Sequence, residues 1–184
     1  ITYNDENYEN TLYRGELTLG RYFGKHFSVF TDYKYNYLRV SVYRPGRTLS
    51  TDGSDSYLTL GTGVSYDTRD LYEYATKGVY FRTSISHSGF IDKEIDFGRF
   101  SLENQSFIPL YLKNDYYITV ATKLNTSFSI GAVIPVYDHQ FLGYGSNYVR
   151  GWTKYTFEGD DVLAVYNEIR IPIIKPRYIK AVEL

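Results

Sequence analysis

Residues 115–131 alternate apolar and polar side chains over a longer distance than strands of soluble proteins usually cover. The apolar face consists of Tyr116, Ile118, Val120, Leu124, Phe128 and Ile130, with Thr122 and Thr126 between them. The polar face consists of Asp115, Thr119, Lys123, Asn125, Ser127 and Ser129. Strands in soluble proteins run about 5 or 6 residues, whereas a tilted strand that crosses a bilayer needs about 9 to 11. The pattern therefore predicts a membrane-spanning β-strand.

The same period of two recurs along the chain. It is found within residues 11–19, 27–42, 58–66, 79–86 and 163–173, and less regularly in 95–110. With the start of another strand at 178–184, this predicts seven to eight antiparallel strands, no helix of useful length and a single domain over 1–184. Within 27–42 the apolar phase changes at Tyr37 and Leu38, which indicates a bulge or the emergence of the strand from the bilayer.

Composition adds to the membrane interpretation. Tyr and Phe number 22 and 11, and aromatic residues make up 18% of the chain. Tyrosine is enriched in strands and at both membrane interfaces. Mean hydropathy does not separate a soluble chain from a membrane barrel, because lipid-facing and lumen-facing side chains alternate. No apolar run reaches the roughly 18 residues that a transmembrane helix needs.

The lengths of the connections suggest an orientation. The two longest links, 44–55 and 132–159, fall on the same side of an up-and-down meander. Outer-membrane barrels have short periplasmic turns and long external loops. We therefore expect 132–159 to be an extracellular loop, with the ten-residue link 68–77 as an unusually long periplasmic turn.

Alternation alone also fits a soluble antiparallel sandwich or a lipocalin-like barrel. In such folds the apolar face of each strand meets a packed core instead of lipid. Strand length and tyrosine content favour the membrane.

The sequence offers no catalytic or metal-binding constellation. His26, His87 and His139 lie far apart without the spacing of metal ligands,. The absence of cysteine excludes a disulfide framework, a thiolate metal site and a Cys nucleophile,. A net charge of -1 gives no support for a nucleic-acid partner,. We expect a protein that is not an enzyme and that uses no cofactor or metal.

One segment with distinctive residues is the turn that joins two expected strands near residue 70. Asp67 and Asp70 are placed to cap the turn and to pair with Arg69. Gly78 frees the backbone for re-entry into the sheet. An elaborated hairpin accounts for these residues structurally.

The other is the stretch Val149, Arg150, Gly151 and Trp152 inside the long loop. Gly151 allows the backbone to approach a wall closely. If the loop folds into the lumen, Arg150 must find a carboxylate, whereas on a surface its charge contributes almost nothing. Glu168, on the lumen-facing set of the following strand, is the candidate partner.

These residues resemble a known superfamily. Val149 to Trp152 is similar to the V/I-R-G-F/Y/W signature of the BamA/TamA insertase and two-partner-secretion transporter superfamily. Asp67 to Gly78 resembles the D-x-R-D…P-x-x-G turn of its surface-antigen barrel, although Ala75 stands where proline is usual. Residues 165–172 resemble the N-x-E-h-R-h-P strand after the loop, where h is apolar. The three motifs occur in the family's order over about 120 residues.

The resemblance implies a sixteen-stranded barrel in the bacterial outer membrane, with these strands as its central part. It implies that the extracellular loop 132–159 folds into the barrel lumen, that Arg150 pairs with Glu168, and that Gly151 and Trp152 pack around this brace. Implied partners are membrane lipids, client polypeptides and accessory subunits bound through periplasmic POTRA domains. The sequence would then be a portion of a longer chain, although about eight strands can also close a barrel.

Three functions follow as hypotheses. The first is a barrel that inserts outer-membrane proteins or translocates polypeptides without chemistry, through a weakly paired seam and a thinned bilayer. The second is a passive porin or adhesin that shares only the architecture. The third is a soluble ligand-binding β-barrel.

Overall fold

The computed structural model describes residues 9–43, 47–112, 116–131, 133–142 and 157–172, and most of them lie in strands. The long strands are β1 (Asn10–Phe23), β2 (Phe27–Val40), β3 (Ser54–Asp67), β4 (Gly78–Gly89), β5 (Phe97–Tyr111), β6 (Tyr117–Gly131) and β9 (Val162–Arg170). Among the described residues, no helix is long and apolar enough to cross a membrane.

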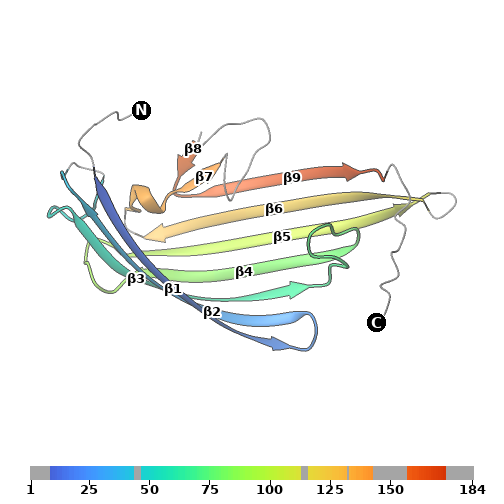
Figure 1. Ribbon diagram of the computed structural model, residues 1–184, viewed down its shortest axis with the longest axis horizontal. Helices are drawn as coiled ribbons and strands as arrows, with labels where there is room; N and C mark the ends of the chain where they lie inside the picture. The colour runs from blue at the N-terminus through green and yellow to red at the C-terminus, as the bar shows by residue number, and fades with distance from the viewer. Residues whose placement is uncertain (1–8, 44–46, 113–115, 132, 143–156, 173–184) are drawn as a thin grey trace, which may run out of the picture.

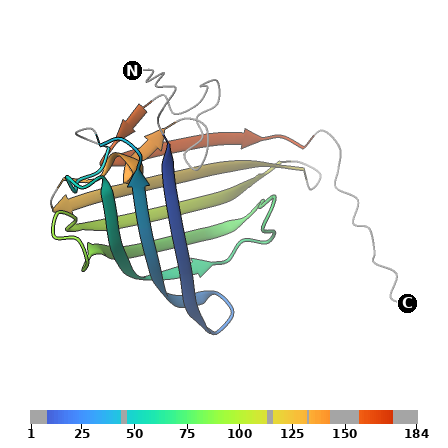
Figure 2. The ribbon, with the colours of Figure 1, turned by 60° about the vertical axis from the view of Figure 1, so that its left-hand side comes forward.

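The seven strands form one antiparallel sheet in the order β1-β2-β3-β4-β5-β6-β9. Each strand pairs with its neighbour in the meander, and Figure 1 shows them side by side in one curved surface. Figure 2 shows that the sheet curls like part of a barrel wall. Within the described residues the sheet stays open between β1 and β9. The expected all-β, up-and-down barrel architecture is confirmed, in partial form.

The strands have the length that the sequence pattern predicts for a membrane-crossing sheet. β1 to β6 contain 12 to 15 residues each and β9 contains nine. The links 41–53, 90–96 and 132–161 lie at one end of the sheet, called here the loop end. The links 24–26, 68–77 and 112–116 lie at the other, called the turn end.

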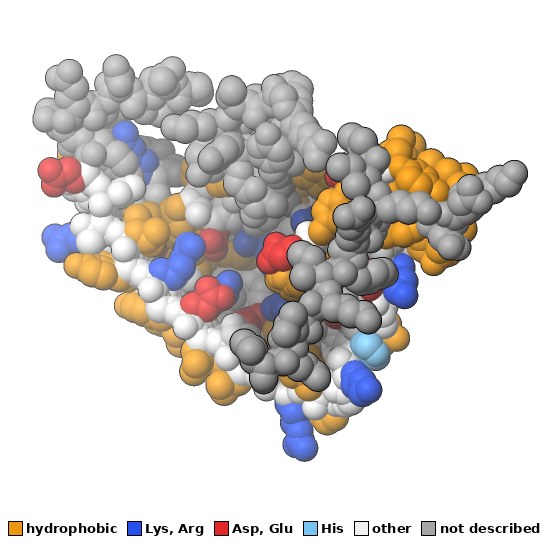
Figure 3. All heavy atoms as spheres, turned by 45° about the vertical axis from the view of Figure 1, so that its right-hand side comes forward, with side chains coloured by type: hydrophobic (Ala, Val, Ile, Leu, Met, Phe, Trp, Pro, Cys, Tyr) orange, Lys and Arg blue, Asp and Glu red, His pale blue; other side chains and the backbone are white. Residues whose placement is uncertain are grey.

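The two faces of the sheet differ in chemistry. The outward face exposes large apolar side chains, among them Tyr13, Leu17, Leu60, Ile85, Phe100, Ile108, Phe128, Val165 and Ile169. The inward face holds ion pairs between Lys34 and Glu16 and between Lys123 and Glu103, each with a nitrogen to oxygen distance of 3.1 Å. Figure 3 shows charged side chains gathered in the hollow of the molecule, with hydrophobic side chains along its outer edges. A bilayer outside and a wet lumen inside explain this arrangement.

The change of apolar phase in β2 is not caused by a bulge. The pairing of β2 with β1 runs without interruption from Phe23↔Phe27 to Asn10↔Val40, and the pairing with β3 is equally regular. Leu38 and Val40 are buried, with 5% and 6% of their surface exposed. The bulge alternative is therefore wrong. Apolar side chains pass from the outward to the inward face as β2 approaches the loop end.

The weak alternation of residues 95–110 has a similar cause. Phe97, at the start of β5, points inward and is 1% exposed, whereas Phe100 belongs to the outward face. Phe97 packs with Tyr57, Ile95 and Ile134 in a small hydrophobic cluster at the loop end. The strand changes its apolar face where the lumen becomes filled with side chains.

A row of polar side chains crosses the outward face of three strands. This polar row consists of Asn104, Ser106, Thr122 and Asn167. Ser106 pairs in register with Thr122, and Thr122 with Asn167. The Thr122 hydroxyl donates to the Asn167 side chain over 3.1 Å, and the Ser106 hydroxyl donates to that of Asn104 over 3.3 Å. Exposed apolar residues flank the row on both sides, namely Phe100 and Ile108 on β5 and Val165 and Ile169 on β9.

Residues 132–159, expected as one irregular loop, contain short regular elements. The 3-10 helix η2 (Val136–Asp138) is followed by β7 (Gln140–Leu142), which pairs antiparallel with β8 (Phe157–Gly159). Figure 1 shows this pair near the start of β9. The loop between β7 and β8, and the strand expected at 178–184, lie outside the described residues.

Candidate functional site

A hollow of about 460 Å³ lies on the inward face of β5, β6 and β9. The inward-facing side chains that line it are Gln105, Phe107, Ala121, Lys123, Tyr166, Glu168 and Arg170. Glu168 is opposite Ala121 in the register of β9 with β6. The carboxylate that the sequence pattern singles out therefore does face the lumen.

Glu168 and Arg170 are neighbours on the inward face of β9, because residues two apart in a strand share a face. The Arg170 Nε donates to Glu168 Oε1 over 2.9 Å. The Arg170 side chain is 18% exposed and that of Glu168 is 40% exposed. Next to them, the Tyr166 hydroxyl is buried and has no hydrogen-bond partner in the described part of the chain. The site combines a carboxylate with an unsatisfied hydroxyl, and both accept hydrogen bonds.

The expected counterpart of Glu168 lies outside the described residues. Val149, Arg150, Gly151 and Trp152 all fall in the segment 143–156. The pairing of Arg150 with Glu168 therefore stays a prediction.

The turn motif at the turn end is built around Arg69, which is only 7% exposed at its side chain. Its Nη2 and Nε donate to the two carboxylate oxygens of Asp67 over 2.7 and 3.0 Å. The guanidinium also lies over the rings of Tyr72 and Tyr80, at 4.8 and 4.4 Å from their centroids. Its Nη1 donates to the side chain of Gln105 on β5 over 3.2 Å. The bidentate pair and the two rings hold Arg69 in one orientation.

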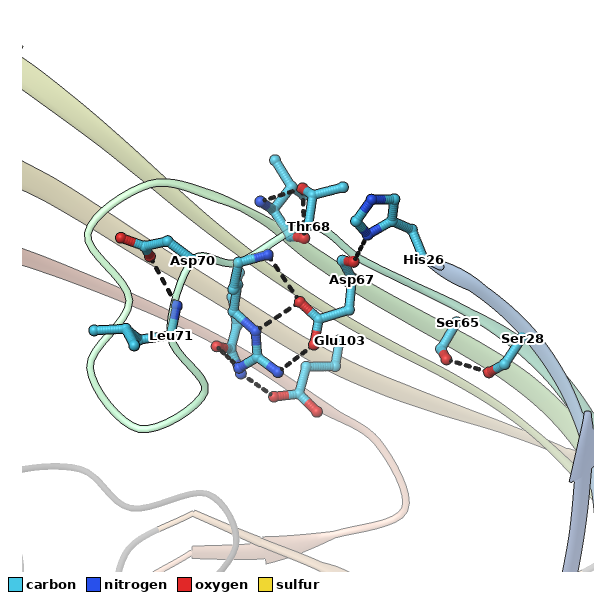
Figure 4. A network of polar contacts seen from close by, with 11 residues as sticks. His26, Ser28, Ser65, Asp67, Thr68, Asp70, Leu71 and Glu103 are labelled. Atoms are coloured by element: carbon cyan, nitrogen blue, oxygen red, sulfur yellow. Dashed lines mark hydrogen bonds and ion pairs between the residues drawn. The ribbon is translucent and has the colours of Figure 1, made fainter. Parts of the chain in front are cut away.

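Asp70 shapes the same turn but does so through hydrogen bonds from the turn itself. Its carboxylate accepts from the backbone N–H groups of Leu71, Thr76 and Lys77 and from the Thr76 hydroxyl. Desolvation raises the pKa of Asp70, but the hydrogen bonds from Thr76, Lys77 and Leu71 outweigh it and leave the pKa below its usual value. Figure 4 shows Asp67 and Asp70 along this turn. Asp67 thus binds the side chain of Arg69, whereas Asp70 binds backbone N–H groups of the turn.

Gly78 begins β4 with a φ of 106°. A Cβ at this position would collide with the carbonyl of Thr68 and with the backbone of Arg69. The two sides of the turn can approach each other this closely only with glycine.

A second polar cluster, which no sequence pattern indicates, lies at the loop end. The Tyr57 hydroxyl donates to Asp138 over 2.9 Å, and the Tyr137 hydroxyl donates to Asp55 over 2.6 Å. Arg99 on β5 donates to the backbone carbonyl of Asp138 over 2.8 Å. We call Asp55, Tyr57, Tyr137 and Asp138 the loop-end anchor. It holds the start of the long loop against the inward face of β3.

The residues of β3 in this anchor are buried. Asp55 and Tyr57 are fully buried, and the two tyrosine rings stack with centroids 6.3 Å apart. Asp55 also accepts the backbone N–H groups of Leu49 and Ser50, each over 2.9 Å. Burial is the largest cause that raises the pKa of Tyr137 above its usual value, and the hydrogen bond to Asp55 is the next largest. The carboxylate of Asp55 therefore binds both Leu49 and Ser50 in the link 41–53 and Tyr137 after β6.

In the part of the chain that the structure describes, no group of three or more His, Asp or Glu side chains is arranged to hold a metal ion. On the inward face, Lys123 forms an ion pair with Glu103 and Arg170 with Glu168, whereas Arg14 and Arg99 donate hydrogen bonds to Asn36 and to the carbonyl of Asp138. The arrangement serves to position backbone segments inside a curved wall.

An apolar outward face, an inward face of ion pairs and strands of 12 to 15 residues define a transmembrane β-barrel wall of the outer-membrane type,. A comparison with protein families names the group. The Omp85 superfamily domain matches residues 2–173, and the chain belongs to the Omp85 superfamily. Members of this superfamily insert or transport polypeptides in the outer membrane. They work there with client polypeptides and membrane lipids. No curated protein matches the chain.

Proposed function

We propose that this chain forms a single barrel domain over residues 1–184 of a bacterial outer-membrane protein that inserts or translocates polypeptides. Loop 132–159 lies in the lumen, and Arg150 pairs with Glu168 to brace the loop against the wall. The loop end faces the outside of the cell and the turn end faces the periplasm. Membrane lipids and client polypeptides are the partners, and no chemical step is involved.

The position of Glu168 is the observation that carries this proposal. Its side chain faces a hollow of about 460 Å³ and is 40% exposed, so a guanidinium has room to reach it. The buried hydroxyl of Tyr166 offers a second acceptor beside it. A guanidinium carries five N–H donors in a fixed fork and suits such a pair of acceptors.

The loop-end anchor supports the path of the loop. Tyr137 and Asp138 hold the first residues of the loop on the inward side of β3 and β5. A loop that starts inside the wall needs no further turn to enter the lumen. The segment that carries Arg150 follows within fifteen residues of this anchor.

The test is the variant Arg150→Ala in the full-length protein. Removal of one partner costs on the order of 3 to 5 kcal/mol for a buried pair and about 0 to 1 kcal/mol for an exposed one. Because the Glu168 side chain is 40% exposed, we expect a cost between these limits. We expect faster proteolysis of residues 143–156 and reduced assembly or export of client proteins. Arg14→Ala, which removes another inward-facing arginine, hydrogen-bonded to Asn36, serves as the control and keeps both readouts near those of the unchanged protein. Unchanged activity together with an unchanged loop in Arg150→Ala would contradict the brace.

A passive porin or adhesin barrel predicts a different result. Deletion of 132–159 would then change conductance or adhesion and leave the levels of outer-membrane proteins as they are. The exposed apolar band on the outward face argues against the soluble ligand-binding barrel, because a soluble protein rarely leaves such a surface open to water,.

A further inference from the structure

The turn 68–77 joins β3 to β4, yet its last residues contact strands much farther along the sheet. The Arg170 Nη1 on β9 donates to the backbone carbonyl of Ala75 over 2.8 Å. The Thr119 hydroxyl on β6 donates to the carbonyl of Thr76 over 3.4 Å. Ala75 and Thr119 are each 2% exposed. The turn therefore reaches across the inward side of the turn end instead of pointing away from it.

Aromatic rings fix the other faces of the same guanidinium. Arg170 lies over the ring of Tyr74 in the turn, 4.6 Å from its centroid, and over the ring of Phe107 on β5, at 5.3 Å. A ring face attracts a guanidinium, and it does so more strongly where water is excluded. The ring of Tyr74 and the carbonyl of Ala75 both hold the turn on Arg170.

Arg170 also binds Glu168 through its Nε, over 2.9 Å. One planar guanidinium thus joins a carboxylate on one edge to a backbone carbonyl on another. A lysine ammonium can replace the charge but lacks the rigid fork that makes both bonds at once.

We propose that Arg170 is a positioning residue that couples the brace carboxylate Glu168 to the turn 68–77. The coupling rests on the proposed function, since it assumes that Arg150 pairs with Glu168. Arg150 and Arg170 then share one carboxylate, so the position of the lumen loop affects how firmly the turn is docked. Linkage makes the effect reciprocal, because undocking the turn weakens the brace by the same factor.

Two other ion pairs of the inward side do not link Glu168 to the turn. Another ion pair of the inward face, between Lys123 and Glu103, joins β6 to β5 with a 3.1 Å contact. Arg69 is committed to Asp67 at the start of the turn. In the described residues, Arg170 alone hydrogen-bonds both to Glu168 and to the turn.

Thiol labelling measures the docking of the turn in the full-length protein in membranes. Residues 1–184 contain no cysteine, so Ala75→Cys introduces a single thiol reporter into them, and this reporter is buried while the turn is docked. Ala164→Cys is the matched control, since Ala164 is 7% exposed on β9 and has no contact with the turn among the described hydrogen bonds. The probe is N-ethylmaleimide, and the readout is the rate of labelling.

The variant Arg170→Lys is expected to raise labelling of Ala75→Cys by roughly fivefold or more, the lower range of a typical coupling. Labelling of Ala164→Cys stays the same. A parallel rise at both positions would show general unfolding and overturn the proposal. Tyr74→Leu, which removes a ring contact and no charge, provides a second test if Arg170→Lys fails to fold, with the same expectation.

Arg150→Ala tests the coupling itself. It is expected to raise labelling of Ala75→Cys, and to add nothing further when Arg170 is already lysine. If Arg150→Ala reduces activity but leaves labelling unchanged, the brace stands and the coupling is overturned. If it changes neither activity nor the loop, the proposed function fails, while the effect of Arg170→Lys on labelling still decides whether Arg170 docks the turn.

Discussion

At the scale of single residues, the turn end depends on positions where the local backbone accepts one type of residue. Gly78 has a φ of 106°, and the carbonyl of Thr68 occupies the space of a Cβ. Asp70 accepts hydrogen bonds from three backbone N–H groups and one hydroxyl, and none of these donors is a charged side-chain group. The shape of the turn is therefore set by local sterics and local hydrogen bonds.

The variant Gly78→Ala is expected to destabilise the protein by on the order of 1 to 3 kcal/mol, because it forces a side chain into a strained backbone conformation. Gly15→Ala is the control, since no atom lies within 4 Å of a Cβ at Gly15. It is expected to stay within about 0.5 kcal/mol of the unchanged protein. Urea unfolding of the refolded protein in lipid vesicles measures both. Equal effects would mean that the turn tolerates a side chain at Gly78.

Acid is expected to loosen the same turn. The hydrogen bonds to Asp70 hold its folded pKa below the unfolded value of 3.8. Their contribution to stability is fully present above the unfolded pKa and is lost as the pH falls through the folded pKa. Hydrogen-exchange protection of the Thr76 and Lys77 amides should therefore fall below about pH 4. In Asp70→Asn these amides should be weakly protected at every pH, and protection that persists at low pH in the unchanged protein would contradict the assignment.

At the scale of elements, the period of two predicts the long strands closely, because one face of each meets lipid over most of its length. It fails to explain the ends of β2 and β5, where Leu38 and Phe97 turn apolar side chains inward. The loop-end anchor was also beyond sequence reasoning. Tyr137 and Asp55 lie 82 residues apart, and neither stands in a recognisable pattern. The three-residue strands β7 and β8 are too short for alternation to reveal.

The polar row on the outward face predicts an effect on stability in lipid. Its hydrogen bonds satisfy some of the polar groups, but the bilayer core offers the remaining donors no partner,. The double variant Asn104→Leu and Ser106→Ala is expected to stabilise the folded protein in vesicles by on the order of 1 kcal/mol. Leu102→Asn, on the same face of β5, should destabilise it. Loss of activity in the double variant despite normal folding would indicate that the row contacts a partner in the membrane.

At the scale of the whole molecule, side chains fill the inward side at both ends of the curved sheet. The loop-end anchor closes one end, and the turn 68–77 reaches across the other. The hollow lined by Glu168 lies beside that turn, because Arg170 also lines it and binds the carbonyl of Ala75. The wall is therefore most constrained at its two rims.

The variant Tyr137→Phe should loosen the loop end. It removes one donor from the buried carboxylate of Asp55, at a cost of about 1 to 3 kcal/mol. Limited proteolysis of residues 133–139 and channel conductance in planar bilayers should both increase. Tyr43→Phe, at a tyrosine that is 41% exposed, is the control and should leave both unchanged. A Tyr137→Phe protein with unaltered proteolysis would show that the stacked rings and Arg99 suffice to hold the loop.

The register of β6 with β9 also bears on the order in which the chain assembles. β5 and β6 close a short turn at Tyr111↔Tyr117, whereas Ser127↔Val162 closes the longest loop in the described sheet. The entropy lost on closing a loop rises with its length, so β9 is expected to join the sheet after the hairpins before it have formed. Arg170 arrives with β9, and the turn 68–77 lacks its anchor at Ala75 until then. Docking of that turn is thus a late folding event. A docked turn indicates that the seventh strand of the sheet, β9, has already joined the wall.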